Sequence, residues 1–153
     1  MLSMALAVPD PDFATRVRDS FSRQNAMAFI GARLIRVEPG LAEIELPYRE
    51  ELTQQHKYFH GGISTMIADS AGGYAAYSLF PATSSVLTVE FKISLLAPAA
   101  GEKLVALGRV VKPGRTLTIT DLEVQAIRDG KATPVLKGLQ TLICLHDKAD
   151  KAA

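Results

Sequence analysis

The sequence predicts an α+β domain in which a curved antiparallel β-sheet wraps around one long central helix. Three observations support this class. Residues 61–80 carry apolar side chains at helical spacing, whereas the later stretches alternate apolar and polar residues as strands do. The links between these later stretches are too short for crossover helices, which indicates antiparallel pairing. One sheet must then cover the apolar stripe of the helix.

A shorter helix and a hairpin are expected before the central helix. Asp10 is a candidate N-cap with Pro11 at the first helical position, and the apolar residues that follow at intervals of four predict a helix over about residues 11–24. Residues 32–38 and 41–47 are short strand-like runs on either side of a Pro-Gly turn. We expect them to pair as a hairpin.

Four strands are expected after the central helix. Residues 87–95 show the cleanest alternation in the chain, with one apolar face, and further strands are predicted over 102–111, 115–128 and 134–145. We expect the four to form a meander. Within 115–128 the apolar phase changes, which predicts a β-bulge near Asp121.

Length and charge indicate one ordinary domain. The 153 residues carry 17 basic and 16 acidic side chains, a net charge of +1. We expect a single domain over residues 1–153, with an N-terminal helical extension over 1–27 and a frayed tail over 146–153. The near-neutral charge argues against a nucleic-acid partner.

The sequence also predicts a cytoplasmic protein without a metal. No run of 18 apolar residues occurs, so no membrane span is expected, and the apolar residues 1–8 lack the basic region of a signal peptide. The lone cysteine, Cys144, cannot form an internal disulfide. Together with three scattered histidines it lacks the paired spacing of a zinc site.

The junction before the central helix is a candidate site. His60 is followed by Gly61 and Gly62, and a helix that begins at a glycine pair presents free backbone N–H groups at the positive end of its dipole. Such a terminus can hold a developing oxyanion. The alternative is an ordinary loop-to-helix junction in which His60 is a polar cap.

Asp69 is the second candidate, because it lies on a helix face of small residues. At 100° per residue its neighbours on that face are Gly62, Thr65, Gly72, Gly73 and Ala76. An exposed face would normally carry longer charged side chains, so we expect this face to be covered. A covered carboxylate is either paired structurally or held for chemistry.

Spacing along the helix indicates a site shared between two chains. Asp69 lies eight residues beyond Gly61, about 12 Å along the helix axis, so one chain cannot easily place both on one carbonyl. If the small-residue face packed against its own copy about a two-fold axis, Asp69 of one chain would approach the Gly61 amide of the other. A C2 dimer would build two such sites.

These motifs resemble a known family. The run His60-Gly61-Gly62, followed seven residues later by Asp69, resembles the hotdog-fold acyl-CoA thioesterases of the phenylacetic-acid-degradation type. The strand over 89–98 and the hairpin over 112–116 are also similar to that family, and the resemblance covers about residues 28–145.

The resemblance implies a reaction and the roles of four residues. In that family the Gly61 amide would polarise the thioester carbonyl, Asp69 of the partner chain would act as nucleophile or general base, Thr88 would help to place water, and His60 would support the loop. The reaction would hydrolyse acyl-CoA to free acid and CoA without a cofactor. The protein would be a homodimer or a dimer of dimers.

One departure from the family concerns the residue about six positions before the histidine. Family members commonly have Asn there, whereas this chain has Gln54 followed by Gln55, and a Gln can donate and accept as an Asn does. Either residue is a candidate to face the thioester.

Four further residues are candidates for substrate binding. Gly62 belongs to the same glycine pair, and His56 either orients the loop or the substrate or is incidental. Lys112 and Arg115 flank a tight turn and are candidates to bind CoA phosphates, Arg by bidentate geometry, although turn charges are usually solvated.

Two other functions are compatible with the predicted fold. A non-catalytic acyl-CoA binder would keep the pocket but would not need Asp69. A hydratase or dehydratase of this fold would show an Asp-x-Asn-x-x-His pattern, which the chain lacks.

Overall fold

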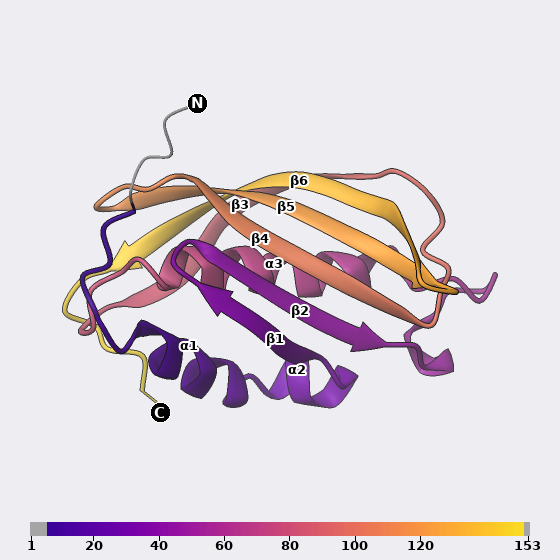
Figure 1. Cartoon of the computed structure of the whole chain (residues 1–153), viewed down its shortest axis with the longest axis horizontal. Coiled ribbons are helices and arrows are strands. Elements are labelled where there is room, and N and C mark those ends of the chain that lie inside the picture. Colours follow the sequence, from indigo (N-terminus) through magenta and orange to yellow (C-terminus); the bar gives the residue numbers. More distant parts are fainter. Residues whose placement is uncertain (1–5, 152–153) are drawn as a thin grey trace.

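The computed structural model describes residues 6–151 and confirms the predicted α+β class (Figure 1). Six antiparallel strands form one curved sheet that arches over α3, while α1 and α2 lie below it. Residues 1–5 of the predicted N-terminal extension and 152–153 of the predicted tail lie outside the described residues. The elements are α1 Phe13–Ser22, α2 Asn25–Ile30, β1 Arg33–Glu38, β2 Leu41–Pro47, a 3-10 turn Glu50–Leu52, α3 Gly61–Tyr77, β3 Ser85–Leu95, β4 Lys103–Lys112, β5 Leu117–Arg128 and β6 Lys131–Leu145.

The core forms where the alternating strands meet the apolar side of α3. In β2, Ile44 and Leu46 are fully buried, and they belong to the same apolar cluster as Ile67 and Ala71 of α3. The predicted hairpin of β1 and β2 is confirmed, and Gly40 adopts the left-handed φ of +73° that its turn requires. The hairpin thus forms one wall around the central helix.

The strand order differs from the predicted meander. The order is β1-β2-β4-β5-β6-β3, so β3 lies at an edge and pairs with β6, while β4 pairs with β2. The link over residues 96–102 therefore runs from β3 past β6 and β5 to β4, a distance of three strand spacings, about 14 Å. Seven extended residues reach roughly 20 Å, so a short link does not require adjacent strands.

The extra residue that the sequence predicted near Asp121 of β5 lies in the neighbouring strands instead. β5 keeps one alternation, with Thr118 and Thr120 facing inward as Leu122 does. The register shifts at Val111 of β4, opposite the stretch of β5 just before Asp121, and at Val135 of β6. Inward hydroxyl groups, rather than an extra residue, explain the apparent change of apolar phase.

The first helix is shorter than predicted, and a second helix was not predicted. Asp10 does not cap α1. Its carboxylate accepts hydrogen bonds from the Asp12 N–H and the Arg16 guanidinium, and the helix begins at Phe13. After Ser22 the chain turns into α2, whose six residues are too few to show a helical period.

Arg16 fixes α1 against the end of the central helix. Its guanidinium donates to the carbonyl oxygens of Tyr77 at 3.3 Å and Phe80 at 2.8 Å, and lies 4.1 Å from the Tyr77 ring centroid. The ring of Phe21 also packs edge-on against Tyr74. A cation at the C-terminal end of a helix is favoured by the helix dipole.

Within residues 6–151, every helix falls short of the length and hydropathy needed to cross a bilayer.

The small-residue face of α3 is covered by the chain's own sheet, which corrects the expectation that a second copy covers it. A Cβ at Gly72 would lie 2.0 Å from Oε1 of Gln140 and 2.5 Å from Cδ2 of Leu122. A Cβ at Gly108 of β4 would lie 2.4 Å from the backbone of Ala71. Helix and sheet backbones therefore approach closely here, and only glycine fits.

This packing predicts opposite effects for two adjacent glycines of α3. Gly72→Ala should lower the free energy of unfolding by about 1 to 3 kcal/mol, because the new methyl group overpacks the helix–sheet contact. Gly73→Ala should raise it by about 0.5 to 1 kcal/mol, because alanine favours helix and the nearest atom to its Cβ, on Leu142, is 3.6 Å away. Urea unfolding measures both. Equal effects would contradict the close approach at Gly72.

Candidate active site

The beginning of α3 leaves one backbone N–H without a partner. His60 is the N-cap, and its Nδ1 accepts from the Gly62 N–H at 2.9 Å. Its carbonyl oxygen accepts from Ile63 and Ser64. Among the described residues the Gly61 N–H makes no hydrogen bond. His60 is thus a cap, and by capping it leaves Gly61 as the free donor at the positive end of the helix.

A cavity of about 540 Å³ lies beside this free N–H. Gln54, His56 and Gly61 line it together with apolar residues of the 95–99 segment, whereas Gln55 is exposed and does not line it. The Gln54 side-chain oxygen accepts from the His56 N–H, which leaves its amide nitrogen available. The buried hydroxyl of Ser64 also lines the cavity and has no hydrogen-bond partner among the described residues.

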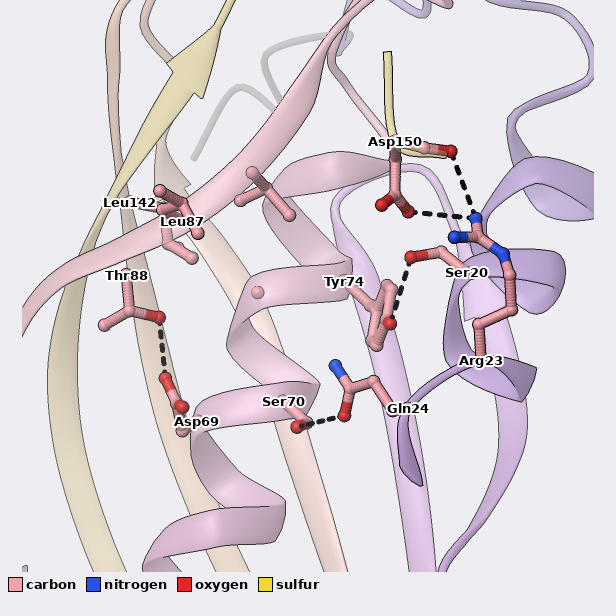
Figure 2. Close-up of a pocket in the computed structure, with 12 residues that line it drawn as sticks. Ser20, Arg23, Gln24, Asp69, Ser70, Tyr74, Leu87, Thr88, Leu142 and Asp150 are labelled. Atoms are coloured by element: carbon pink, nitrogen blue, oxygen red, sulfur yellow. Dashed lines mark hydrogen bonds and ion pairs between the residues drawn. The ribbon is translucent and has the colours of Figure 1, made fainter. Parts of the chain in front are cut away.

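The Asp69 carboxylate is held from two strands. The Thr88 hydroxyl of β3 donates to Asp69 Oδ1 at 2.7 Å (Figure 2). The Gln140 side chain of β6 donates to the same oxygen at 2.5 Å, and also lies 3.1 Å from the Asp69 carbonyl oxygen and 3.0 Å from Thr88 Oγ1. No hydrogen bond to Oδ2 occurs among the described residues. One carboxylate oxygen is therefore fixed and the other is free to react.

Gln140 is a site residue that the sequence analysis missed. It is 1% exposed, and its Oε1 accepts from the Thr120 hydroxyl at 3.1 Å, so the buried amide is satisfied on both sides. The available signal was a glutamine between Leu136 and Leu142, in the row of inward-facing positions of β6 that is otherwise apolar. Which residues of β6 face the core can be decided only when the side of the sheet on which its alternate residues lie is known.

Asp69 opens to a second cavity, of about 410 Å³. Thr88 lines this cavity, but Gly61 does not. Both residues belong to the one helix α3, and eight residues of helix separate them by about 12 Å. One chain therefore carries two half-sites, a free N–H in one cavity and a carboxylate in the other.

The remaining predicted binding residues lie outside these half-sites. Lys112 and Arg115 are exposed on the turn between β4 and β5 and line neither of the two cavities. The Gly62 N–H is occupied by His60. The structure thus groups Gln54, His56 and Gly61, and separately Asp69 and Thr88.

The edge strand β3 connects the two half-sites. The expected strand is confirmed. Val86 and Ile93 pack against the core, but Leu87, Val89 and Leu95 are 56% to 59% exposed. At one end Thr88 binds Asp69. At the other end Leu95 lies against Gly61, because a Cβ on Gly61 would be 2.8 Å from Leu95 Cδ1.

Comparison with known proteins assigns the chain to a family. The thioesterase superfamily model matches residues 56–133. A putative esterase from Saccharolobus solfataricus is 35% identical over 103 residues, which cover 67% of this chain and 72% of the relative. The chain belongs to the thioesterase superfamily.

Solved structures show that this thioesterase has the hotdog fold. A thioesterase family protein from Silicibacter pomeroyi is 47% identical with a TM-score of 0.86, covering 88% of this chain and 98% of that one. The Escherichia coli PaaI protein of the phenylacetic acid degradation operon is 19% identical with a TM-score of 0.79, covering 90% and 96%. The predicted hotdog fold and thioesterase family are confirmed.

The segment matched by the superfamily model contains Gly61, Asp69 and Thr88 but ends before Gln140. It also excludes α1 and the residues after β6. The matched segment therefore includes Gly61 and Asp69 but neither Gln54 nor Gln140.

Proposed function

We propose that this thioesterase hydrolyses acyl-CoA thioesters to a free acid and CoA. The observation that carries the proposal is the Asp69 carboxylate, fixed through Oδ1 by Thr88 and Gln140 and free at Oδ2 beside a cavity. A positioned carboxylate can attack a carbonyl carbon or take a proton from water. A protein that only bound acyl-CoA would not need this arrangement.

The Gly61 N–H supplies the second part of the reaction. It donates to the thioester oxygen and stabilises the negative charge that develops there when the carbonyl carbon is attacked. The C–S bond then breaks, the acyl group gains the oxygen of water, and the CoA sulfur takes a proton. Asp69 acts either as the nucleophile or as the general base. Single-turnover hydrolysis in heavy-oxygen water, followed by mass analysis of the protein, distinguishes these roles.

The two half-sites join in a homodimer formed along β3. Edge strands with exposed apolar residues are templates for pairing with another chain. Antiparallel pairing of β3 with its own copy about a two-fold axis sets the Leu95 end of one strand beside the Thr88 end of the other. Gly61 of one chain then approaches Asp69 of its partner. The apolar side chains of β3 are buried in the same step.

Other residues support this reaction. His60 leaves the Gly61 N–H free, and Gln54, rather than Gln55, faces the thioester because it lines the Gly61 cavity with His56. We also propose that Lys112 and Arg115, which are exposed at the turn after β4, bind the CoA phosphates. The reaction needs no cofactor, and it takes place in the cytoplasm, where CoA thioesters occur.

The first prediction about the proposed reaction concerns the carboxylate. Asp69→Asn keeps the shape of the side chain and should lower kcat by at least about 100-fold, the scale expected for a positioned base. Thiol release from a panel of acyl-CoAs measures the effect. Asp147→Asn is the matched control, because Asp147 is exposed and lines neither cavity. An Asp69→Asn variant with more than half of the wild-type kcat would falsify the assignment.

The second prediction concerns the buried amide. Gln140→Met keeps a long side chain but removes the donor to Asp69 Oδ1, so kcat should fall at least about tenfold while KM changes little, because Gln140 orients the carboxylate and does not contact the substrate. Thr141→Val is the control, because Thr141 binds Glu90 and not Asp69. A rise in KM at constant kcat would show instead that Gln140 shapes the binding site.

The third prediction concerns the shared site. Asp69→Asn chains and Gly61→Pro chains should each be inactive alone, because proline removes the amide donor. Gly61 is the first helical residue and His60 is extended at φ −62° and ψ 137°, so proline suits the backbone there, although the end of the Leu95 side chain, 2.8 Å from a Cβ at this position, has to move aside. A mixed dimer regains one intact site of two. Random exchange should restore about a quarter of wild-type activity.

Native mass spectrometry counts the mixed dimers, and circular dichroism establishes that the Gly61→Pro chain is folded. If mixed dimers of folded chains hydrolyse nothing, each site is built within one chain and the proposed dimer is wrong.

A further inference from the structure

The turn between β4 and β5 carries two cations without a carboxylate partner. Lys112 and Arg115 are exposed, and neither forms an ion pair among residues 6–151. By contrast, Lys137 of β6 pairs with Asp121 and Glu123 of β5. Two uncompensated positive charges on one turn attract an anion.

A β-bulge places Lys112 on the solvent side of this turn. The pairing of β4 with β5 shifts by one residue at Val111, so Lys112 lies opposite Ile119. Without the shift it would lie opposite Thr118, which is 1% exposed and faces the core. Bulges commonly re-aim a side chain in this way. The bulge therefore brings both cations of the turn to the surface.

The first half of the turn is held from inside the fold. The Gly114 N–H donates to the Thr118 hydroxyl at 3.3 Å, and the same hydroxyl lies 3.4 Å from the Gly114 carbonyl oxygen. A Cβ at Gly114 would lie 2.0 Å from the carbonyl oxygen of Leu117, so only glycine fits this tight turn. These contacts leave the backbone here one conformation.

The end of β6 holds the second half of the turn. The Cys144 N–H donates to the Thr116 carbonyl oxygen at 2.8 Å. Two residues later, Nε2 of His146 lies 2.8 Å from the Arg115 carbonyl oxygen. A carbonyl oxygen only accepts, so Nε2 carries the hydrogen and the imidazole ring donates. His146 thus fixes the backbone of Arg115 itself.

We propose that His146 is a positioning residue for CoA, which holds the Arg115 carbonyl oxygen so that the Arg115 guanidinium meets a phosphate of the nucleotide. The inference rests on the proposed function and on the phosphate contacts assigned there to Lys112 and Arg115. It adds a residue after β6, outside the segment 56–133 that the superfamily model matches.

The orientation of Arg115 matters because of the geometry of its contact. A guanidinium binds a phosphate best through two parallel N–H···O bonds, which require a defined direction of approach. A turn that is already ordered loses less conformational freedom when the ligand binds, so the ligand binds more tightly. The hydrogen bond from His146 supplies part of this order before CoA arrives.

The test measures CoA binding by titration calorimetry and acyl-CoA hydrolysis by thiol release. His146→Ala removes the donor and should raise the Kd of free CoA and the KM of acyl-CoA about three- to tenfold, the scale of one ordered contact. The value of kcat should stay within about twofold, because the lost binding is common to ground and transition states. The KM of the matching acyl-pantetheine, which lacks the phosphates, should not change.

Two control variants separate the hydrogen bond from the charge and bulk of the tail. His146→Gln keeps an N–H donor at a similar reach and should bind CoA within about twofold of the wild-type affinity. Lys148→Gln removes an exposed cation two residues along the same tail and should also leave the affinity unchanged. A loss in Lys148→Gln equal to that in His146→Ala would assign the effect to tail charge instead.

A double-mutant cycle shows whether His146 acts through Arg115. Arg115→Ala should weaken CoA binding about tenfold or more, as expected for a hydrogen bond to a charged group. Adding His146→Ala should then weaken binding less than about twofold further, because no guanidinium is left to position. Losses that simply multiply would mean that His146 contributes independently of Arg115.

Each result supports or overturns the inference. Wild-type CoA affinity in His146→Ala, no rescue by His146→Gln, or independent losses in the double variant overturns the positioning role and leaves thioester hydrolysis intact. Wild-type affinity in Arg115→Ala overturns the phosphate contact together with the role of His146. If the protein hydrolyses no acyl-CoA, the proposed function is wrong, while the titrations with free CoA still decide the role of His146.

Discussion

The buried amide of Gln140 links the sheet to the central helix, and the arrangement of the candidate site depends on it. A buried amide left unpaired costs about 1 to 3 kcal/mol, so the fold must bring partners to both of its ends. Thr120 satisfies the oxygen, and Asp69 with Thr88 satisfies the nitrogen. Gly72 leaves the space that the amide occupies. The contact that satisfies the core therefore also orients the carboxylate.

The Gly61 half-site also depends on which hydrogen-bonding groups find a partner. A helix start has several N–H groups without helical partners. His60 binds two of them, the Gly62 N–H through its ring and the Ile63 N–H through its carbonyl oxygen, and the one it leaves is the Gly61 N–H. In both half-sites the neighbouring hydrogen bonds determine which atom is left free, the Gly61 N–H in one and Asp69 Oδ2 in the other. What a single chain lacks is proximity between them, and the exposed strand β3 runs from one to the other.

Periodicity was sufficient to predict α3, the β1–β2 hairpin and the class of the fold, because each depends on residues close in sequence. Strand order was not predictable in this way, since the pairing of β3 with β6 joins residues about fifty positions apart and link length permits several orders. Gly61 and Asp69 were singled out from the motif and its helical spacing, and Thr88 from the family resemblance, and the structure places Thr88 in contact with Asp69. Gln140 was missed because one polar residue in an apolar strand has meaning only when its neighbour across the core is known.

One wall of the Asp69 cavity comes from segments near the two ends of the described chain, which meet at the Arg23–Asp150 pair. These segments take no part in the Gln140 contact, but Val17 of α1 is fully buried in one apolar cluster with Tyr74 and Tyr77 of α3. The wall of the cavity is therefore also part of the core. A change of α1 between relatives has to be matched on α3, so the shape of this cavity and the stability of the fold cannot vary independently.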